Sequence, residues 1–126
     1  MNRKVLLIED EPNIIEAIRF LLTRDGWDVQ THSDGTDAVE VIRTGAPDLV
    51  ILDVMLPGKS GMDILRDLRD IDELANLPVL MLTARGQARD RELAEKFGVS
   101  RFMTKPFSNI EVLTAVRDLH AQATRP

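Results

Sequence analysis

Side chains that could carry out chemistry follow the ends of short, mostly apolar segments. The segments 5–8, 49–52, 79–82 and 99–103 are followed, directly or within two residues, by Glu9, Asp10, Asp53, Thr83 and Lys105. Carboxylates that lie close together repel one another unless a proton or a cation intervenes, and oxygen ligands suit Mg²⁺. A lysine and a hydroxyl can stabilise phosphoryl oxygens, and a carboxylate can accept a phosphoryl group as the nucleophile. The pattern therefore predicts Mg²⁺-dependent phosphoryl chemistry centred on Asp53.

Taken singly, most of these residues have a simpler structural interpretation. An acid such as Asp10 is common in a solvated turn or the first turn of a helix, and Thr83 suits a cap. Lys105 alone is typical of a surface lysine. Asp53 differs because apolar residues flank it on both sides, at 49–52 and 54–56, so a simple polar loop does not explain it. The prediction therefore depends on the whole set.

The elements that must position these residues can be predicted from hydrophobic patterns. Continuous apolar runs at 5–8, 49–52 and 79–82 predict strands buried on both faces of a parallel sheet. Alternating patterns at 27–30 and 99–103 predict half-exposed edge strands. Helical spacing of apolar residues predicts a helix after each strand, and the fourth helix has the thinnest apolar stripe.

Two local signals set the ends of the predicted helices. Pro12 suits the first turn of the first helix, and Gly26 can end that helix. Ser108 with Glu111 three residues later predicts a capping box at the start of the last helix.

Strand and helix alternate five times, which predicts an α/β fold with parallel strands and right-handed crossovers. We expect residues 1–126 to form a single doubly wound (βα)5 domain, with no effector domain in this chain. The strand order 2-1-3-4-5 is borrowed from the flavodoxin-like class, and it places both alternating segments at the sheet edges. The carboxyl ends of the strands form the working edge of such a sheet, which is where the candidate residues would meet.

Composition excludes several other classes of protein. The chain has 16 basic and 21 acidic residues, a net charge of −5, no cysteine and two histidines. Direct nucleic-acid binding, a disulfide framework and a thiolate or histidine metal site are therefore not expected. The longest apolar runs have four residues, so we expect no signal peptide or membrane span and a soluble, cytoplasmic protein.

Several segments together resemble the receiver domain of two-component response regulators, including the chemotaxis receivers. They are residues 5–12, 47–57, 82–84 and 104–107, with Gly58 and Gly61. The resemblance extends from residue 4 to about residue 122 and is specific because these segments occur in this order with these spacings. It implies a bacterial signalling domain of phosphorelay systems, catalysing only its own phosphorylation and dephosphorylation.

The resemblance implies a phosphoacceptor and a metal site. Asp53 matches the aspartate that accepts a phosphoryl group from a sensor histidine kinase or a phosphotransfer protein. Glu9, Asp10 and Asp53 match the metal-binding carboxylates, and Met55 matches the residue that lends its backbone carbonyl. The implied cofactor is Mg²⁺, with Mn²⁺ as a substitute.

The resemblance also implies the parts of a switch. Lys105 would pair with Asp53 or its phosphate, and Thr83 would turn its hydroxyl to the phosphoryl group. Phe102 matches an aromatic that swings inward behind it, although an ordinary edge-strand aromatic is an equal interpretation. The Lys105–Pro106 bond matches a cis peptide. Phosphorylation would shift the fourth helix, fifth strand and fifth helix, and so control an output domain or protein.

Three other functions remain open at this point. A haloacid dehalogenase type phosphohydrolase also uses a strand-end aspartate, but it needs an acid where this chain has Met55. A flavodoxin-type flavin module would need hydroxyls and amides at residues 9–11, which here are all acidic. A pseudo-receiver would act as an interaction module without phosphorylation.

Overall fold

The computed structural model describes residues 3–84 and 88–124, which form one parallel sheet covered by helices on both faces. The strands are β1 (Arg3–Ile8), β2 (Trp27–His32), β3 (Leu49–Asp53), β4 (Val79–Thr83) and β5 (Arg101–Thr104). The helices are α1 (Pro12–Arg24), α2 (Ala38–Gly45), α3 (Gly61–Arg69), α4 (Ala88–Lys96) and α5 (Asn109–Ala123), with a short 3₁₀ turn η1 (Asp72–Leu74).

The sheet has the order β2-β1-β3-β4-β5, and all four neighbouring pairs are parallel. The predicted α/β class and strand order are therefore confirmed. Both alternating segments form edge strands, and both are partly exposed, whereas every residue of β3 and β4 is buried. The physical basis of the prediction holds, because only the central strands are covered by helices on both faces.

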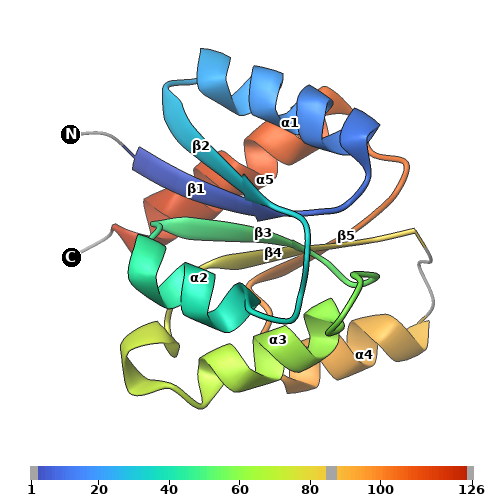
Figure 1. Cartoon of the computed structure of the whole chain (residues 1–126). Helices are drawn as coiled ribbons and strands as arrows, with labels where there is room; N and C mark the ends of the chain where they lie inside the picture. Colours follow the sequence, from blue (N-terminus) through green and yellow to red (C-terminus); the bar gives the residue numbers. More distant parts are fainter. Residues whose placement is uncertain (1–2, 85–87, 125–126) are drawn as a thin grey trace.

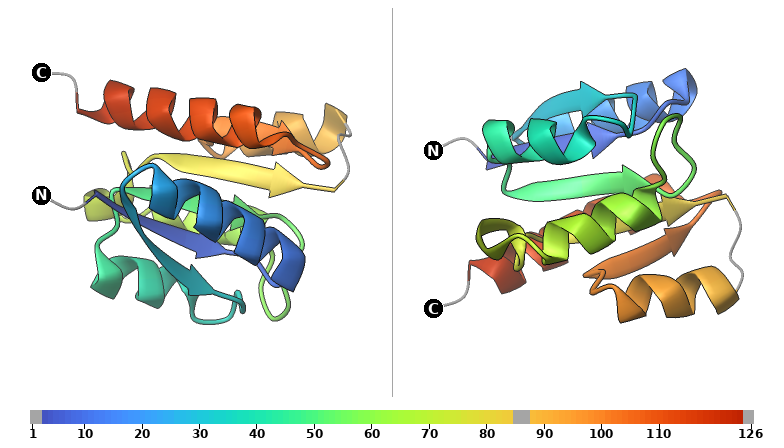
Figure 2. Two further views of the ribbon diagram at one scale, coloured as in Figure 1. Left: turned by 90° about the horizontal axis from the view of Figure 1, so that it is seen from above. Right: turned by 60° about the horizontal axis from the view of Figure 1, so that its bottom comes forward.

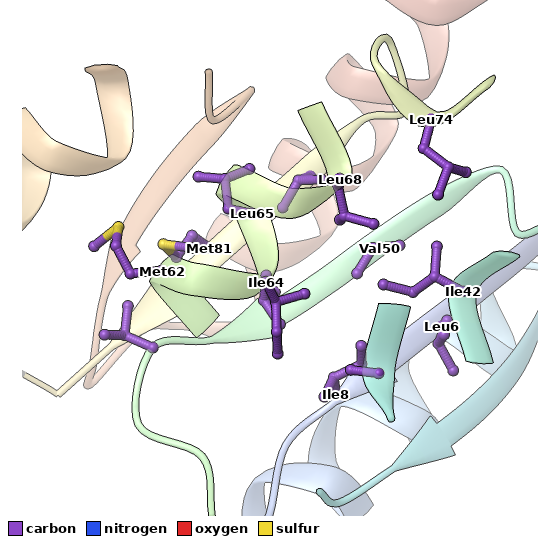
Figure 3. Packing of buried hydrophobic residues seen from close by; sticks show 14 of the residues in the cluster. Leu6, Ile8, Ile42, Val50, Met62, Ile64, Leu65, Leu68, Leu74 and Met81 are labelled. Atoms are coloured by element: carbon purple, nitrogen blue, oxygen red, sulfur yellow. The ribbon is translucent and has the colours of Figure 1, made fainter. Parts of the chain in front are cut away.

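The helices form two layers. Helices α1 and α5 cover one face of the sheet, and α2, α3 and α4 cover the other (Figure 1). The right-hand view of Figure 2 shows the three-helix layer facing the reader. The core under this layer is made of aliphatic and methionine side chains from the sheet and from α2 and α3 (Figure 3). The labelled members include Leu6, Ile8, Ile42, Val50, Ile64, Leu65, Leu68 and Met81.

Helix ends follow the local signals in the sequence. Pro12 opens α1, and Gly26 lies just beyond its end with a φ of 91°. Such a positive φ favours glycine because a Cβ would be strained there. Ser108 and Glu111 form the predicted capping box of α5. Within the described ranges no helix combines the length and hydropathy needed to span a membrane.

The predicted bounds of the two edge strands were partly wrong. Strand β2 continues past residue 30 to His32, because the whole segment pairs with β1. Strand β5 begins at Arg101, not at Val99. The Val99 N–H donates to the carbonyl of Ala94, and thus closes the end of α4. The pairing with β1 and the hydrogen bond that ends α4 decide these bounds, and hydrophobic alternation encodes neither.

Candidate functional site

Three carboxylates meet at the carboxyl edge of the sheet. Glu9 and Asp10 follow β1, and Asp53 ends the adjacent strand β3. One oxygen from each of the three lies within 4.8 Å of the others. Glu9 is 0% exposed and Asp53 only 2%, while Asp10 is open to solvent. The sheet topology thus brings the predicted acids together, with two of them withdrawn from water.

Glu9 is held by the backbone that follows it. Its Oε2 accepts hydrogen bonds from the N–H groups of Asp10 and Glu11, at 3.0 and 3.2 Å. Burial is the main reason that the pKa of Glu9 is raised, and the adjoining Asp53 carboxyl group raises it further. The Lys105 ammonium opposes this shift without cancelling it. A proton or a cation between Glu9 and Asp53 would therefore stabilise the cluster.

Lys105 brings the positive charge to this cluster. Its Nζ lies 3.0 Å from Glu9 Oε1, 3.2 Å from Glu11 Oε1 and 3.4 Å from Asp53 Oδ2. Its side chain is 11% exposed. Burial alone would lower the pKa of Lys105, but the surrounding carboxylates outweigh it and raise the pKa. The ammonium therefore stays charged and faces the oxygens of Asp53.

The chain around Lys105 fixes its position. The Lys105 N–H donates to the carbonyl of Thr83 at 2.7 Å, which extends the pairing of β4 with β5. The Lys105–Pro106 peptide bond is cis. Thr83 is 1% exposed at the end of β4, and it pairs in register with Thr104. The lysine and the threonine therefore lie at the same sheet edge as the acids.

The loop after Asp53 is constrained by glycine. The Met55 N–H points to Asp53 Oδ1 at 3.3 Å, and the Met55 side chain is exposed. A Cβ added to Gly61 would lie 2.0 Å from the Asp53 carbonyl oxygen, so the start of α3 needs a glycine for this close approach. The Gly61 N–H donates to the Val54 carbonyl and closes the loop. This loop path keeps Met55 next to Asp53.

A second loop braces the first. The Gly35 N–H donates to the Pro57 carbonyl at 2.9 Å, joining the loop after β2 to the loop after β3. A Cβ on Gly35 would lie 1.9 Å from the backbone oxygen of Lys59. Gly58 has a φ of 85° and lies against Thr36 and Asp34. The backbone of both loops is therefore in direct contact beside the acidic cluster.

Phe102 lies on β5, the strand next to the one that ends in Thr83. It is half-buried on β5 and pairs in register with Met81, two residues before Thr83. The guanidinium of Arg91 on α4 lies 5.2 Å from the centre of the Phe102 ring, a cation–π distance. Together with Arg101 and Ile110, they line a surface hollow between α4, β5 and α5.

Sequence reasoning missed two residues of this region. Glu11 was read only as part of the acidic run after β1, although its carboxylate contacts Lys105. Its place in that run was a usable signal, because all three acids follow the same strand. Arg91 gave no comparable signal, since a charged residue on an exposed helix is ordinary.

The donor set fits a hard divalent cation. Its atoms are all oxygens, two of the three carboxylates are buried, and their mutual repulsion is the kind that a cation relieves. The fold and the site together define an α/β domain of the flavodoxin-like class with an acidic, lysine-containing site at its carboxyl edge.

Comparison with known proteins gives the family. The family model described as the response regulator receiver domain matches residues 5–117. The chain therefore belongs to the receiver domain family of two-component response regulators, as the resemblance implied.

Solved structures of receiver domains are similar to this chain over nearly its whole length. The BeF3-activated N-terminal receiver domain of RstA from Klebsiella pneumoniae is 32% identical with a TM-score of 0.84, covering 94% of this chain and 98% of that one. The receiver domain of a sensor histidine kinase from Pseudomonas aeruginosa, with a magnesium ion coordinated in its active site cleft, is 26% identical with a TM-score of 0.87, covering 96% and 99%. The chemotaxis response regulator CheY4 of Vibrio cholerae, at 24% identity and a TM-score of 0.87, shares the fold, covering 94% and 99%.

Proposed function

We propose that this chain is a phosphorylation-dependent switch whose phosphoacceptor is Asp53. The observation that carries the proposal is the surroundings of Asp53. This nearly buried carboxylate lies 3.4 Å from the Lys105 ammonium and beside the carboxylates of Glu9 and Asp10. Burial alone would make such a charge unfavourable. A site built to receive Mg²⁺ and a phosphoryl group accounts for it.

The transfer step uses one oxygen of Asp53. That oxygen forms a bond to phosphorus while the phosphorus–nitrogen bond of a donor phosphohistidine breaks, and the electron pair of the broken bond stays on the histidine nitrogen. Mg²⁺ would be held by Glu9, Asp10, Asp53 and the Met55 carbonyl. When bound, it would neutralise part of the negative charge of the phosphoryl group. Lys105 offers an ammonium 3.4 Å from Asp53 Oδ2.

Thr83 and Phe102 would pass the phosphorylation state to the surface. A new phosphoryl group adds about −1.5 to −2 charges and strong acceptor oxygens, which attract the Thr83 hydroxyl. Phe102 lies on the neighbouring strand under Arg91, so an inward movement of its ring breaks the Arg91 contact. The face formed by α4, β5 and α5 would carry the signal to the output partner.

Helix α4 is suited to such movement. Ala94 is the only buried residue of this helix, whereas α3 buries Gly61, Met62, Ile64, Leu65 and Leu68. Segments with little apolar burial have low local stability and are common in switching elements.

The partners follow from the family. We propose a sensor histidine kinase or a phosphotransfer protein as the donor, and an output domain or protein as the receiver of the signal. Two of the similar structures are receiver domains of histidine kinases. Residues 1–126 would form one receiver module. This module would work in the cytoplasm, where such donors present their phosphohistidine.

Intact mass tests the acceptor. After incubation with acetyl phosphate and Mg²⁺, the wild-type chain should gain about 80 Da, one phosphoryl group. Asp53→Asn should show no gain, because the amide is no nucleophile for this transfer. A chain that stays at its original mass would support the pseudo-receiver, and turnover of a generic phosphomonoester would support the phosphohydrolase.

Amide exchange tests the switch. Beryllofluoride with Mg²⁺ should mimic the phosphorylated state and change the protection of α4 and β5 more than that of β3. Unchanged exchange in α4 and β5, while beryllofluoride binds, would contradict the proposed output face.

A further inference from the structure

Lys105 is shared among three carboxylates, and Asp53 is the most distant of them. The ammonium lies 3.0 Å from Glu9, 3.2 Å from Glu11 and 3.4 Å from Asp53. To stabilise a phosphoryl group on Asp53, Lys105 must turn from its other partners to the new oxygens. The strength of those other contacts therefore influences how well the site receives the group.

Glu11 differs from the other two partners. Glu9 and Asp53 belong to the carboxylate cluster that fits a divalent cation, and Glu11 does not. A cation at this cluster would neutralise Glu9 and Asp53, but it would leave Glu11 to compete for Lys105. The Glu11 side chain is also open to solvent, at 57% exposed, while that of Lys105 is only 11% exposed.

The side chain of Glu11 does not serve the helix that follows it. It precedes α1 at the place where a side chain often caps the first turn, but no side-chain cap bond is formed there. Its Oε1 instead accepts a hydrogen bond from Lys105 Nζ. The contact joins the start of α1 to the end of β5, 94 residues apart.

We propose that Glu11 is a positioning residue that restrains Lys105 and thereby limits the affinity of the site for the phosphoryl group. The inference rests on the proposed function and names a regulator of the same site. The phosphorylated state of this chain is therefore less stable than its core carboxylates, lysine and threonine would allow.

The test is the affinity of the whole chain for beryllofluoride in saturating Mg²⁺. Glu11→Gln should bind it about two- to five-fold more tightly, the range expected from losing one exposed ion pair. Labelling by acetyl phosphate should accelerate in the same variant. Unchanged or weaker beryllofluoride binding by Glu11→Gln would overturn the inference.

Two further variants separate the lysine contact from bulk charge. Glu16→Gln removes an equal charge from an exposed position of α1 that lines the groove beside Asp10. It should change the affinity much less than Glu11→Gln does, and an equal effect would overturn the inference. Glu11→Asp keeps the charge but shortens the reach to Lys105, so it should resemble Glu11→Gln; wild-type affinity in this variant would contradict the contact.

A double-mutant cycle gives a readout that a merely structural role would not move. In a Lys105→Gln background the effect of Glu11→Gln should disappear, because the residue through which Glu11 acts is absent. A persistent effect would show that Glu11 acts by another route. Mg²⁺ affinity without beryllofluoride should change no more in Glu11→Gln than in Glu16→Gln. Failure of the proposed function can be told apart from failure of the Glu11 inference, because in the first case the wild type would gain no phosphoryl mass.

Discussion

Glu9 and Asp53 are carboxylates with almost no exposure to water, and the chain stabilises them with local donors. Two backbone N–H groups donate to Glu9, and the ammonium of Lys105 lies between both acids. The raised pKa of Glu9 shows that these donors do not fully compensate burial and the neighbouring Asp53. A carboxylate pair left in this condition is suited to bind a cation.

The contact between Gly61 and Asp53 leads to a prediction at this scale. Gly61→Ala places a methyl carbon 2.0 Å from the Asp53 carbonyl oxygen, so the backbone must shift. We expect a loss of about 1–3 kcal/mol in the free energy of unfolding. Phosphorylation of Asp53 should also slow, because the loop carrying Met55 is displaced.

The matched control is Gly45→Ala, whose new Cβ would meet only Gln30 Oε1 at 3.8 Å. Urea unfolding should show this variant at or slightly above the wild-type stability, since alanine suits a helix better than glycine. Equal stabilities of the two variants would contradict the close-approach argument.

At the scale of elements, Arg69 holds three segments together at the edge of the sheet opposite the acidic site. Its guanidinium donates to the carbonyls of Leu74, Leu77 and Gly98, at 3.2, 2.8 and 2.8 Å. Burial lowers its pKa. The arginine thus ties the end of α3 to the turn before β4 and to the turn between α4 and β5.

Arg69→Ala should lower the free energy of unfolding by about 2 kcal/mol, because three carbonyls lose a charged donor. Arg66→Ala, on the same helix, removes a side chain that is 51% exposed. It makes two long ion pairs, at 3.6 and 3.7 Å, and a cation–π contact 5.9 Å from the centre of the Phe97 ring. Its cost should stay below about 1 kcal/mol. Chemical denaturation of both variants checks the difference, and a similar loss in each would refute the role given to Arg69.

The pair of Asp25 and Arg117 joins the end of α1 to α5 and predicts a pH dependence. Hydrogen bonds from Arg117 are the main cause of the lowered pKa of Asp25. A lowered pKa in the folded state means that the pair stabilises the fold above the ordinary value of 3.8, and that this stability is lost as the pH falls through the lower native pKa.

Asp25→Asn should therefore reduce the thermal midpoint near neutral pH, and its difference from wild type should shrink in acid below that ordinary value. Asp28→Asn removes an exposed carboxylate from β2 and should leave the pH profile of the midpoint almost unchanged. A constant difference between Asp25→Asn and wild type at every pH would exclude the pair as its cause.

At the scale of the whole molecule, the acidic site brings carboxylates from the ends of β1 and β3 close together, and their charges repel each other. An ion that binds only the folded chain must raise its stability. Mg²⁺ at about one hundred times its dissociation constant should add about 2.7 kcal/mol. Thermal unfolding with and without Mg²⁺ measures this gain.

Asp10→Asn should abolish most of that gain while leaving the fold intact, because Asp10 is exposed and belongs to the cluster. A gain that persists in this variant would place the ion elsewhere.

Much of the fold could be predicted from the sequence, because the signals are local. Buried central strands are continuous apolar runs, and edge strands alternate, so the patterns at 49–52 and 27–30 were sufficient to separate the two kinds. The Ser108–Glu111 capping box was also predicted, since it lies within one turn. The acids and Lys105 were predicted to share one edge because parallel strands all end there.

What only the tertiary structure decided concerns partners that are far apart in the chain. The start of β5 depends on its register with β4, and the burial of Glu9 depends on the loops packed around it. The sharing of Lys105 among three acids, the ties of Arg69 and the contact of Arg91 with Phe102 likewise have no local signature. Periodicity in a sequence encodes which face of an element is apolar, whereas the distance between two side chains is set by how those elements pack.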